Sequence, residues 1–152
     1  MAKENDLKIA EEVSKNLRIR DIHLAESNCW RDLSFKPKQA HVDINIEIKS
    51  LNSTNKGVLP FSCRFRLIGM DTDKDKESFN LNITFIAVYN KEDNYKPTKK
   101  QKDAFGLTNA IFNVWPYVRE HVQSTMIKMN LTAFVLPPIT INGLSKMVKS
   151  DG

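Results

Sequence analysis

Cysteine is scarce in this chain, and long apolar runs are missing. Its 152 residues include two cysteines, which form no CxxC pair and imply no disulfide framework. No apolar run approaches the ~18–20 residues that a membrane span needs, so we expect no membrane insertion. The N-terminus, MAKENDLKIAEEV, has acidic residues where a signal peptide would have its apolar region. These features predict a cytoplasmic protein.

Histidine is also scarce, and it is not arranged for chemistry. His23, His41 and His121 lack the spacing of metal ligands, so no metal site is expected. His121 follows Glu120 and has the character of a general base, but no motif places a serine or cysteine beside it as a nucleophile. The sequence therefore predicts no catalytic residue, and we expect a protein that is not an enzyme.

Alternation of apolar and polar residues is the dominant pattern of the first half of the chain. The stretch AHVDINIEIKS, from Ala40, holds four repeats of period two, which is typical of a half-buried strand. Residues 61–67 and 79–85 alternate in the same way. An earlier strand, about 17–27, changes phase, and a β-bulge near Arg20-Asp21 would reconcile its two halves. Residues 17–90 are thus predicted to form a four-stranded antiparallel sheet.

The rest of the chain has helical patterns. Residues 1–16 predict an N-terminal helix or arm, and residues 101–130 have a helical period interrupted by Pro116. Proline suits the first turn of a helix better than its interior. We therefore expect a bent helix pair, with one helix ending near Val114 and the next starting at Pro116.

Pro137-Pro138 ends the helical pattern and leaves a C-terminal segment, 136–152. Strands followed by helices predict an α+β fold, in which helices pack on one face of the four-stranded antiparallel sheet. No repeat, low-complexity segment or linker divides the chain, so residues 1–152 are expected to form a single domain.

The segment FNVWPYVREHVQSTMIKMNLTAFVLPPITI resembles the SecB family of export chaperones. That family has an aromatic-Pro-Tyr-x-Arg-Glu core here, matched by Trp115-Pro116-Tyr117 and Arg119-Glu120, and a later Leu-x-Pro-like element, matched by 136–139. The strand around 19–24, with its phase slip, and the strand VDINIEI are similar to the family's first two strands. The resemblance covers about residues 17–141 in order.

The resemblance implies a holdase chaperone that works without ATP and without a cofactor. It also implies a homotetramer, a dimer of dimers, that holds unfolded client protein in apolar grooves between sheet and helices. Client-contacting side chains are expected to be apolar or aromatic and incompletely buried against their own sheet. The candidates are Leu24, Trp30, Phe35, Phe85, Tyr89, Phe105, Phe112, Trp115, Met126, Phe134 and Leu136.

Several residues depart from the pattern of the export members, which are acidic and deliver preproteins to the translocation motor SecA. The chain has a net charge of 23 − 18 = +5, and its tail, LSKMVKSDG, is not acidic. Asn80 and Asn82 fall where the family has a leucine and a glutamate on its acidic sheet surface, although Asp21 matches one acidic position. These departures argue against coupling to SecA. They favour the SecB-like chaperones dedicated to the antitoxin of a toxin–antitoxin system, with the general export chaperone as the alternative.

A nucleic-acid-binding module is a further alternative. Residues 96–102 hold four lysines in seven positions, with Tyr95 beside them. A sheet that binds RNA would show aromatic residues on its exposed face. The phenylalanines of the predicted strands instead share the apolar parity, so a nucleic-acid partner is not expected.

Overall fold

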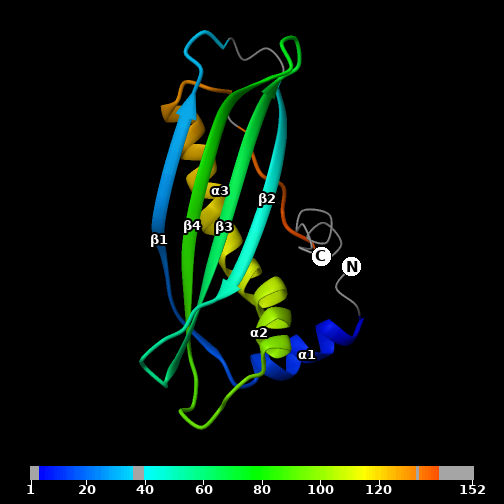
Figure 1. Ribbon diagram of the computed structural model, residues 1–152, viewed down its shortest axis with the longest axis vertical. Coiled ribbons are helices and arrows are strands. Elements are labelled where there is room, and N and C mark those ends of the chain that lie inside the picture. Colours follow the sequence, from blue (N-terminus) through cyan, green and yellow to red (C-terminus); the bar gives the residue numbers. More distant parts are fainter. Residues whose placement is uncertain (1–3, 36–39, 133, 141–152) are drawn as a thin grey trace.

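The architecture is an open antiparallel sheet with helices on one face (Figure 1). The computed structural model describes residues 4–35, 40–132 and 134–140. The strands follow the order β1-β4-β3-β2, so β1 and β2 are the two edges of the sheet. This confirms the predicted α+β class with four antiparallel strands. The strands are β1 (Arg18–Arg31), β2 (Ala40–Ser50), β3 (Val58–Asp71) and β4 (Lys76–Asn90).

The two edge strands pair differently with the centre of the sheet. β2 pairs with β3 in one unbroken register, from Ala40 opposite Asp71 to Ser50 opposite Phe61. β1 pairs with β4 with two register shifts, one between residues 19 and 21 and one between residues 24 and 26. The first shift confirms the predicted bulge near Arg20-Asp21. The second was not predicted.

The helical part departs from expectation at Pro116. The helices are α1 (Glu4–Ser14), α2 (Lys99–Phe105) and α3 (Ile111–Lys128), and a π-helical turn, η1 (Gly106–Ala110), joins α2 to α3. The predicted break at Pro116 is wrong, because α3 continues through this residue and the irregular turn lies earlier, at η1. Pro116 is on the exposed side of α3, where water can bond the Phe112 carbonyl that lacks its helical partner.

The core lies between α3 and the sheet. α3 crosses the helix-covered face obliquely, from the α2 end beneath β2 and β3 toward the far end of β1 (Figure 1). Its Val114, Val118 and Val122 are fully buried, as are Phe65 and Leu81 of the central strands. The apolar stripe of this helix is therefore used for packing on the sheet.

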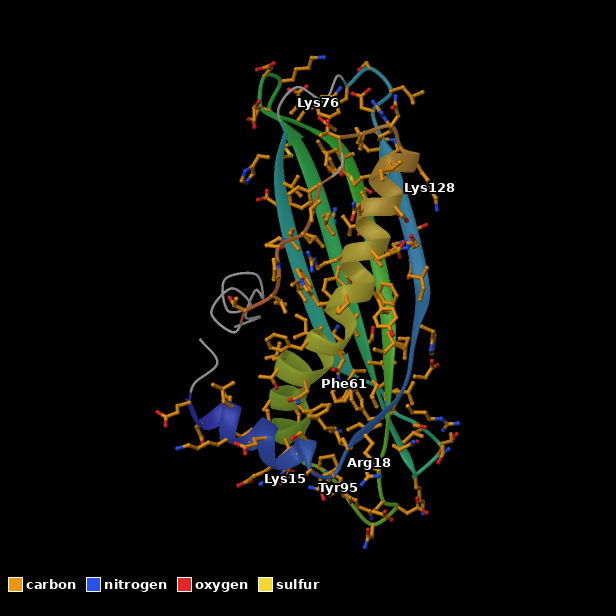
Figure 2. All side chains as sticks on the ribbon, turned by 180° about the vertical axis from the view of Figure 1, so that it is seen from behind. Lys15, Arg18, Phe61, Lys76, Tyr95 and Lys128 are labelled. Carbon is orange, nitrogen blue, oxygen red and sulfur yellow. The ribbon has the colours of Figure 1, made fainter. Side chains whose placement is uncertain are left out.

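An extended segment, residues 134–140, covers the part of this face that α3 leaves open. It starts beside α3, crosses β2 on the helix-covered side and comes out beyond the outer edge of β2 in both views (Figures 1 and 2). Trp115 Nε1 donates a hydrogen bond to the Pro137 carbonyl at 2.9 Å, and Arg119 Nε donates one to the Leu136 carbonyl at 2.8 Å. Leu136 is buried, so both backbone and side chain fix this segment on α3.

No helix in the described ranges has the length and apolar character that a membrane crossing requires.

Candidate functional site

A groove of about 950 Å³ follows the free edge of β2. Six consecutive β2 residues, 45–50, line it. Successive strand residues point to opposite faces of a sheet, so a groove that touches all six follows the edge rather than one face. The remaining lining residues are Phe61, Arg64, Arg66, Asn82, Lys99, Lys102, Asp103, Gly106 and Leu107.

One wall of the groove is apolar and is built where η1 meets β2. Ile46 is buried, Ile48 is partly buried, and Leu107 of η1 is 39% exposed. Gly106 allows this approach, because a Cβ there would lie 3.0 Å from Ile48 Cγ2 and 3.3 Å from the Phe61 ring. Figure 2 shows Phe61 at the α2 end of the sheet. The π-helical turn therefore brings a half-exposed leucine against the strand edge, and such turns are frequent at functional sites.

The other wall is charged and belongs to the face without helices. Arg64 lies opposite Glu47 across the β2–β3 pair, with Arg64 Nη1 3.6 Å from Glu47 Oε2. The hydrogen bond from Lys49 lowers the pKa of Glu47, and the positive charges of Lys49 and Arg64 add to this effect. Arg66 lies opposite Asn45 in the same pair. The Glu47 carboxylate in this wall is therefore ionised at neutral pH, beside the positive charges of Lys49 and Arg64.

The other edge of the sheet has an exposed apolar surface. On the helix-covered side of β1, Ile19 is 49% and Leu24 is 44% exposed. Tyr117 of α3 is 50% exposed, and its ring centre lies 6.3 Å from that of buried Phe85. Trp30 is 49% exposed and lies on the face without helices. This edge therefore exposes apolar side chains on both faces.

A serine and a histidine join β1 to α3 beside this surface. Ser27 Oγ and His121 Nε2 lie 2.8 Å apart, and the His121 ring packs edge-on against Phe85. Burial lowers the pKa of His121, so the imidazole is neutral at pH 7. Among the described residues, none bonds the second ring nitrogen, so the pair lacks the orienting group of a catalytic triad. Ser27 and His121 are 94 positions apart, which is why no sequence motif indicated the contact.

The eleven predicted client-contacting residues lie outside the β2 groove. Leu24 and Trp30 are exposed, and Phe112 and Phe134 are partly buried. The other seven are buried in this chain, because they are part of its hydrophobic core. They are Phe35, Phe85, Tyr89, Phe105, Trp115, Met126 and Leu136. A client would reach these seven only if a covering element moved, and the role of all eleven in client binding stays a prediction.

Sequence reasoning missed the groove, although it identified the strand that forms it. The alternation of β2 placed Ile46 and Ile48 on the apolar side, but it carried no information that β2 is an edge. The lysines of residues 96–102, three of which belong to α2, were weighed only for an affinity for nucleic acid. Only the strand order shows that the apolar side of β2 and the lysines of α2 line the same groove.

The remaining polar side chains form local pairs. His23 Nδ1 lies 2.8 Å from Asp21, and His41 Nε2 lies 3.0 Å from Asp43. No group of three histidine, cysteine or carboxylate side chains in the described part of the chain has the geometry of a metal site. Burial raises the pKa of Cys63 to about 12, so this thiol stays protonated.

No protein-family model matches the sequence, and no curated protein matches it at a significant level. Among solved structures, the chain is similar to the SecB-like chaperone Rv1957 of Mycobacterium tuberculosis, in complex with a ChAD peptide from the HigA1 antitoxin Rv1956. The TM-score is 0.73 at 18% identity, over 88% of this chain and 97% of that one. A protein of unknown function from Streptococcus agalactiae aligns at a TM-score of 0.47 and 7% identity, over 80% and 96% of the two chains. At these identities the comparison concerns architecture, and this chain has the SecB-like fold.

Proposed function

We propose that this protein is an ATP-independent holdase chaperone that binds unfolded polypeptide without catalysing a reaction. The client we propose is the antitoxin of a toxin–antitoxin system, and the site of action is the cytoplasm. The observation that carries the proposal is the groove at the edge of β2. An unfolded segment has exposed apolar side chains and unpaired backbone groups. An apolar wall next to a free strand edge can bind both.

The antitoxin client is supported by two features. A chaperone of this fold has been solved with an antitoxin peptide. The face without helices also differs from the acidic surface expected of an export chaperone. Arg66 is the neighbour of Asn82 on this face, and Arg64 is the neighbour of Thr84. The guanidinium groups at the centre of this face would repel a partner that binds an acidic surface. Delivery to SecA is therefore the weaker proposal.

The assembly we propose is a homotetramer, built as a dimer of dimers. The β1 edge and the outer side of α3 are the surfaces proposed for contact between copies. Exposed Ile19, Leu24 and Tyr117 are the apolar groups that would be buried there. The mass of the assembly in solution, measured by light scattering, tests this point directly, and a stable monomer would contradict it.

Binding of nucleic acid is not favoured by the charge of the described residues. They contain 18 lysines and arginines, which is 23 minus the five at positions 3, 36, 38, 146 and 149. They contain 17 acidic residues, which is 18 minus Asp151. The described surface is therefore close to neutral overall, and phosphate binding depends on a clear excess of positive charge.

The experiment that tests the proposal is suppression of aggregation. An unfolded model protein is diluted into buffer with and without this chain, in the absence of ATP, and light scattering is followed. We expect scattering to fall in proportion to the chain added, and adding ATP should not release the client. If an antitoxin gene lies beside the gene for this chain, the same assay with that antitoxin tests the dedicated client. Normal aggregation of both substrates would rule out the holdase function.

A further inference from the structure

We infer that the β2 groove selects extended segments in which apolar residues alternate with acidic ones, and that it binds them as an added strand. This inference rests on the proposed chaperone function and specifies the client chemistry of its site. It depends on three observations: the free edge of β2, the different chemistry of the two walls, and the charge of the rim.

The edge of β2 suits the addition of a strand. Among residues 4–35, 40–132 and 134–140, β2 is hydrogen-bonded to β3 on one side only, and the groove lies along the other side over residues 45–50. Its register with β3 has no bulge, so its outward backbone groups are evenly spaced. An unprotected, regular edge of this kind is a template for an extended peptide.

The two walls read alternate residues of such a peptide. Side chains of an added strand point alternately to the two faces of the sheet. Those on the helix-covered side would meet the apolar wall of Ile46, Ile48 and Leu107. Those on the other side would lie beside Asn45, Glu47 and Lys49 of β2, and the long arginine side chains of β3, one strand further in, would reach them across β2. The strand that fits is therefore apolar at every second position and polar between.

The charge of the rim decides which polar residues fit. Five cationic side chains and two carboxylates line the groove. Both carboxylates already have partners within the chain, since Glu47 pairs with Lys49 and Arg64, and Lys99 Nζ lies 2.7 Å from Asp103. A ligand therefore meets a net positive rim.

Arg66 and Lys102 are the cations best placed for a ligand. They come from opposite walls, Arg66 from β3 and Lys102 from α2. Within residues 4–35, 40–132 and 134–140, neither side chain has an ion-pair or hydrogen-bond partner. Arg66 can therefore bind an acidic residue on the polar side of an added strand. Lys102 can bind an acidic residue near the end of that strand.

Other occupants fit the same surface less well. The apolar wall offers no partner to phosphates, and Phe61 is buried, so nucleobases have no ring to stack on. A second copy of this chain could add its own strand here. This would give a concentration-dependent mass that changes when Arg66 is replaced.

The experiment compares three peptides of about ten residues, a usual strand length, each with an uncharged dye. The first alternates valine with glutamate, the second has the same composition in two blocks, and the third alternates valine with lysine. Fluorescence anisotropy with the full chain measures their affinities at low salt. We expect the first peptide to bind most tightly, and its advantage should shrink as salt is raised.

Substitutions then assign the preference to the rim. Arg66→Gln and Lys102→Gln should each weaken binding of the glutamate peptide by about two- to fivefold, as for exposed ion pairs. The double variant Arg66→Glu with Lys102→Glu should favour the lysine peptide instead. Lys128→Gln is the matched control, because Lys128 is an exposed lysine at the far end of α3 (Figure 2) and should leave all affinities unchanged.

The outcomes separate this inference from the function on which it rests. Selective loss of glutamate-peptide binding in the two rim variants supports it. Equal binding of all three peptides, with aggregation still suppressed, overturns the inference and leaves the holdase function intact. Equal binding of the alternating and block peptides overturns strand addition. Peptide selectivity without suppression of aggregation supports the groove chemistry and contradicts the holdase function. A single-stranded oligonucleotide that displaces the peptide, or a mass increase that depends on Arg66, overturns the proposed occupant.

Discussion

The two edges of this sheet differ in what they expose. β1 is exposed along nearly its whole length and is interrupted by two bulges. β2 is unbroken in register and has η1 packed against its helix side. β1 therefore exposes side chains, including Ile19, Leu24 and Trp30, whereas β2 offers a regular backbone beside a narrow apolar wall.

This difference indicates which partner each edge fits. Bulges increase the local twist of a strand, so a bulged edge pairs well only with a partner of matching curvature. A second copy of the same strand, related by a two-fold axis, has that curvature by symmetry. An unbulged edge has evenly spaced backbone groups, so it can pair with an extended strand of a different chain. The comparison therefore supports the proposals that copies associate through β1 and that a client binds at β2.

The largest expected effect comes from a substitution in the core at the centre of the sheet, which supports both edges. Phe65 is fully buried at the centre of the sheet, and its ring packs on Trp115 with centres 5.9 Å apart. Phe65→Ala should lower the free energy of unfolding by about 3–5 kcal/mol, because it removes buried contacts and leaves a cavity. Urea unfolding measures this loss, and Phe65→Leu should cost less. If the alanine variant were as stable as the parent, α3 would not be packed on the sheet as described.

The second effect should be confined to the β1 edge. Ile19→Lys combined with Leu24→Lys places charges on the proposed contact between copies. In a two-fold interface it removes four partly exposed side chains, at about 1 kcal/mol each, so association should weaken on the order of 10²- to 10³-fold. Light scattering over a dilution series measures the change.

The control for this variant is Leu33→Lys, because Leu33 is 90% exposed and lies beyond the end of β1. Peptide binding per chain should persist in the double variant, since the β2 groove is built within one chain. An unchanged mass would remove β1 from the assembly. Loss of peptide binding together with assembly would show that the two edges do not act separately.

Much of this comparison could be predicted from the sequence, but not the part that separates the edges. The alternation of β2 and the phase change in β1 arise from local burial, so they identified the strands and one bulge. Strand order depends on contacts between distant segments. Nothing in the local pattern indicates that β2 ends up beside Leu107 or that Ser27 meets His121.

Client-contacting residues are harder to predict from a sequence, for a related physical reason. Apolar aromatic residues are typical both of a core and of a client surface, and composition does not distinguish them. Phe105 is buried against Phe61 and Tyr89, and Trp115 is buried against Phe65. Ile48 was not a candidate. Its place in an alternating strand is ordinary, and so is the presence of lysines elsewhere in the sequence, and only the fold brings the two together.

A smaller effect is expected in the β2 groove. Leu107→Ala removes one partly exposed side chain from the apolar wall, worth about 1 kcal/mol in binding. Peptide affinity should fall by about fivefold, without loss of mass or stability. Leu33→Ala, which is remote from the groove, is the matched control. Complete loss of binding in the folded Leu107 variant would contradict a groove in which the binding free energy is spread over many contacts.

The smallest effect concerns the link between β1 and α3 at His121. Burial holds its pKa below the usual value near 6.5, so the unfolded chain binds more protons than the folded one as pH falls below that value. Stability from this group is therefore complete above pH 6.5 and is lost as pH falls through the folded pKa. The groups that face the imidazole are Ser27, Phe85, Glu120 and Lys128, and the carboxylate of Glu120 partly offsets the effect of burial.

His121→Gln keeps a polar partner for Ser27 but removes the titration. Urea unfolding at pH 7.5 and 5.5 should therefore show a smaller loss of stability in this variant than in the parent. Leu33→Ala is the control, because Leu33 is 90% exposed and has no titratable group, so this change should leave the pH dependence unchanged. Because His121 lies beside the exposed apolar surface of β1, acid should also loosen the β1 edge before the β2 groove. Equal pH dependence in parent and His121 variant would mean that the imidazole is solvated in the folded chain, and that β1 is held to α3 by its apolar contacts alone.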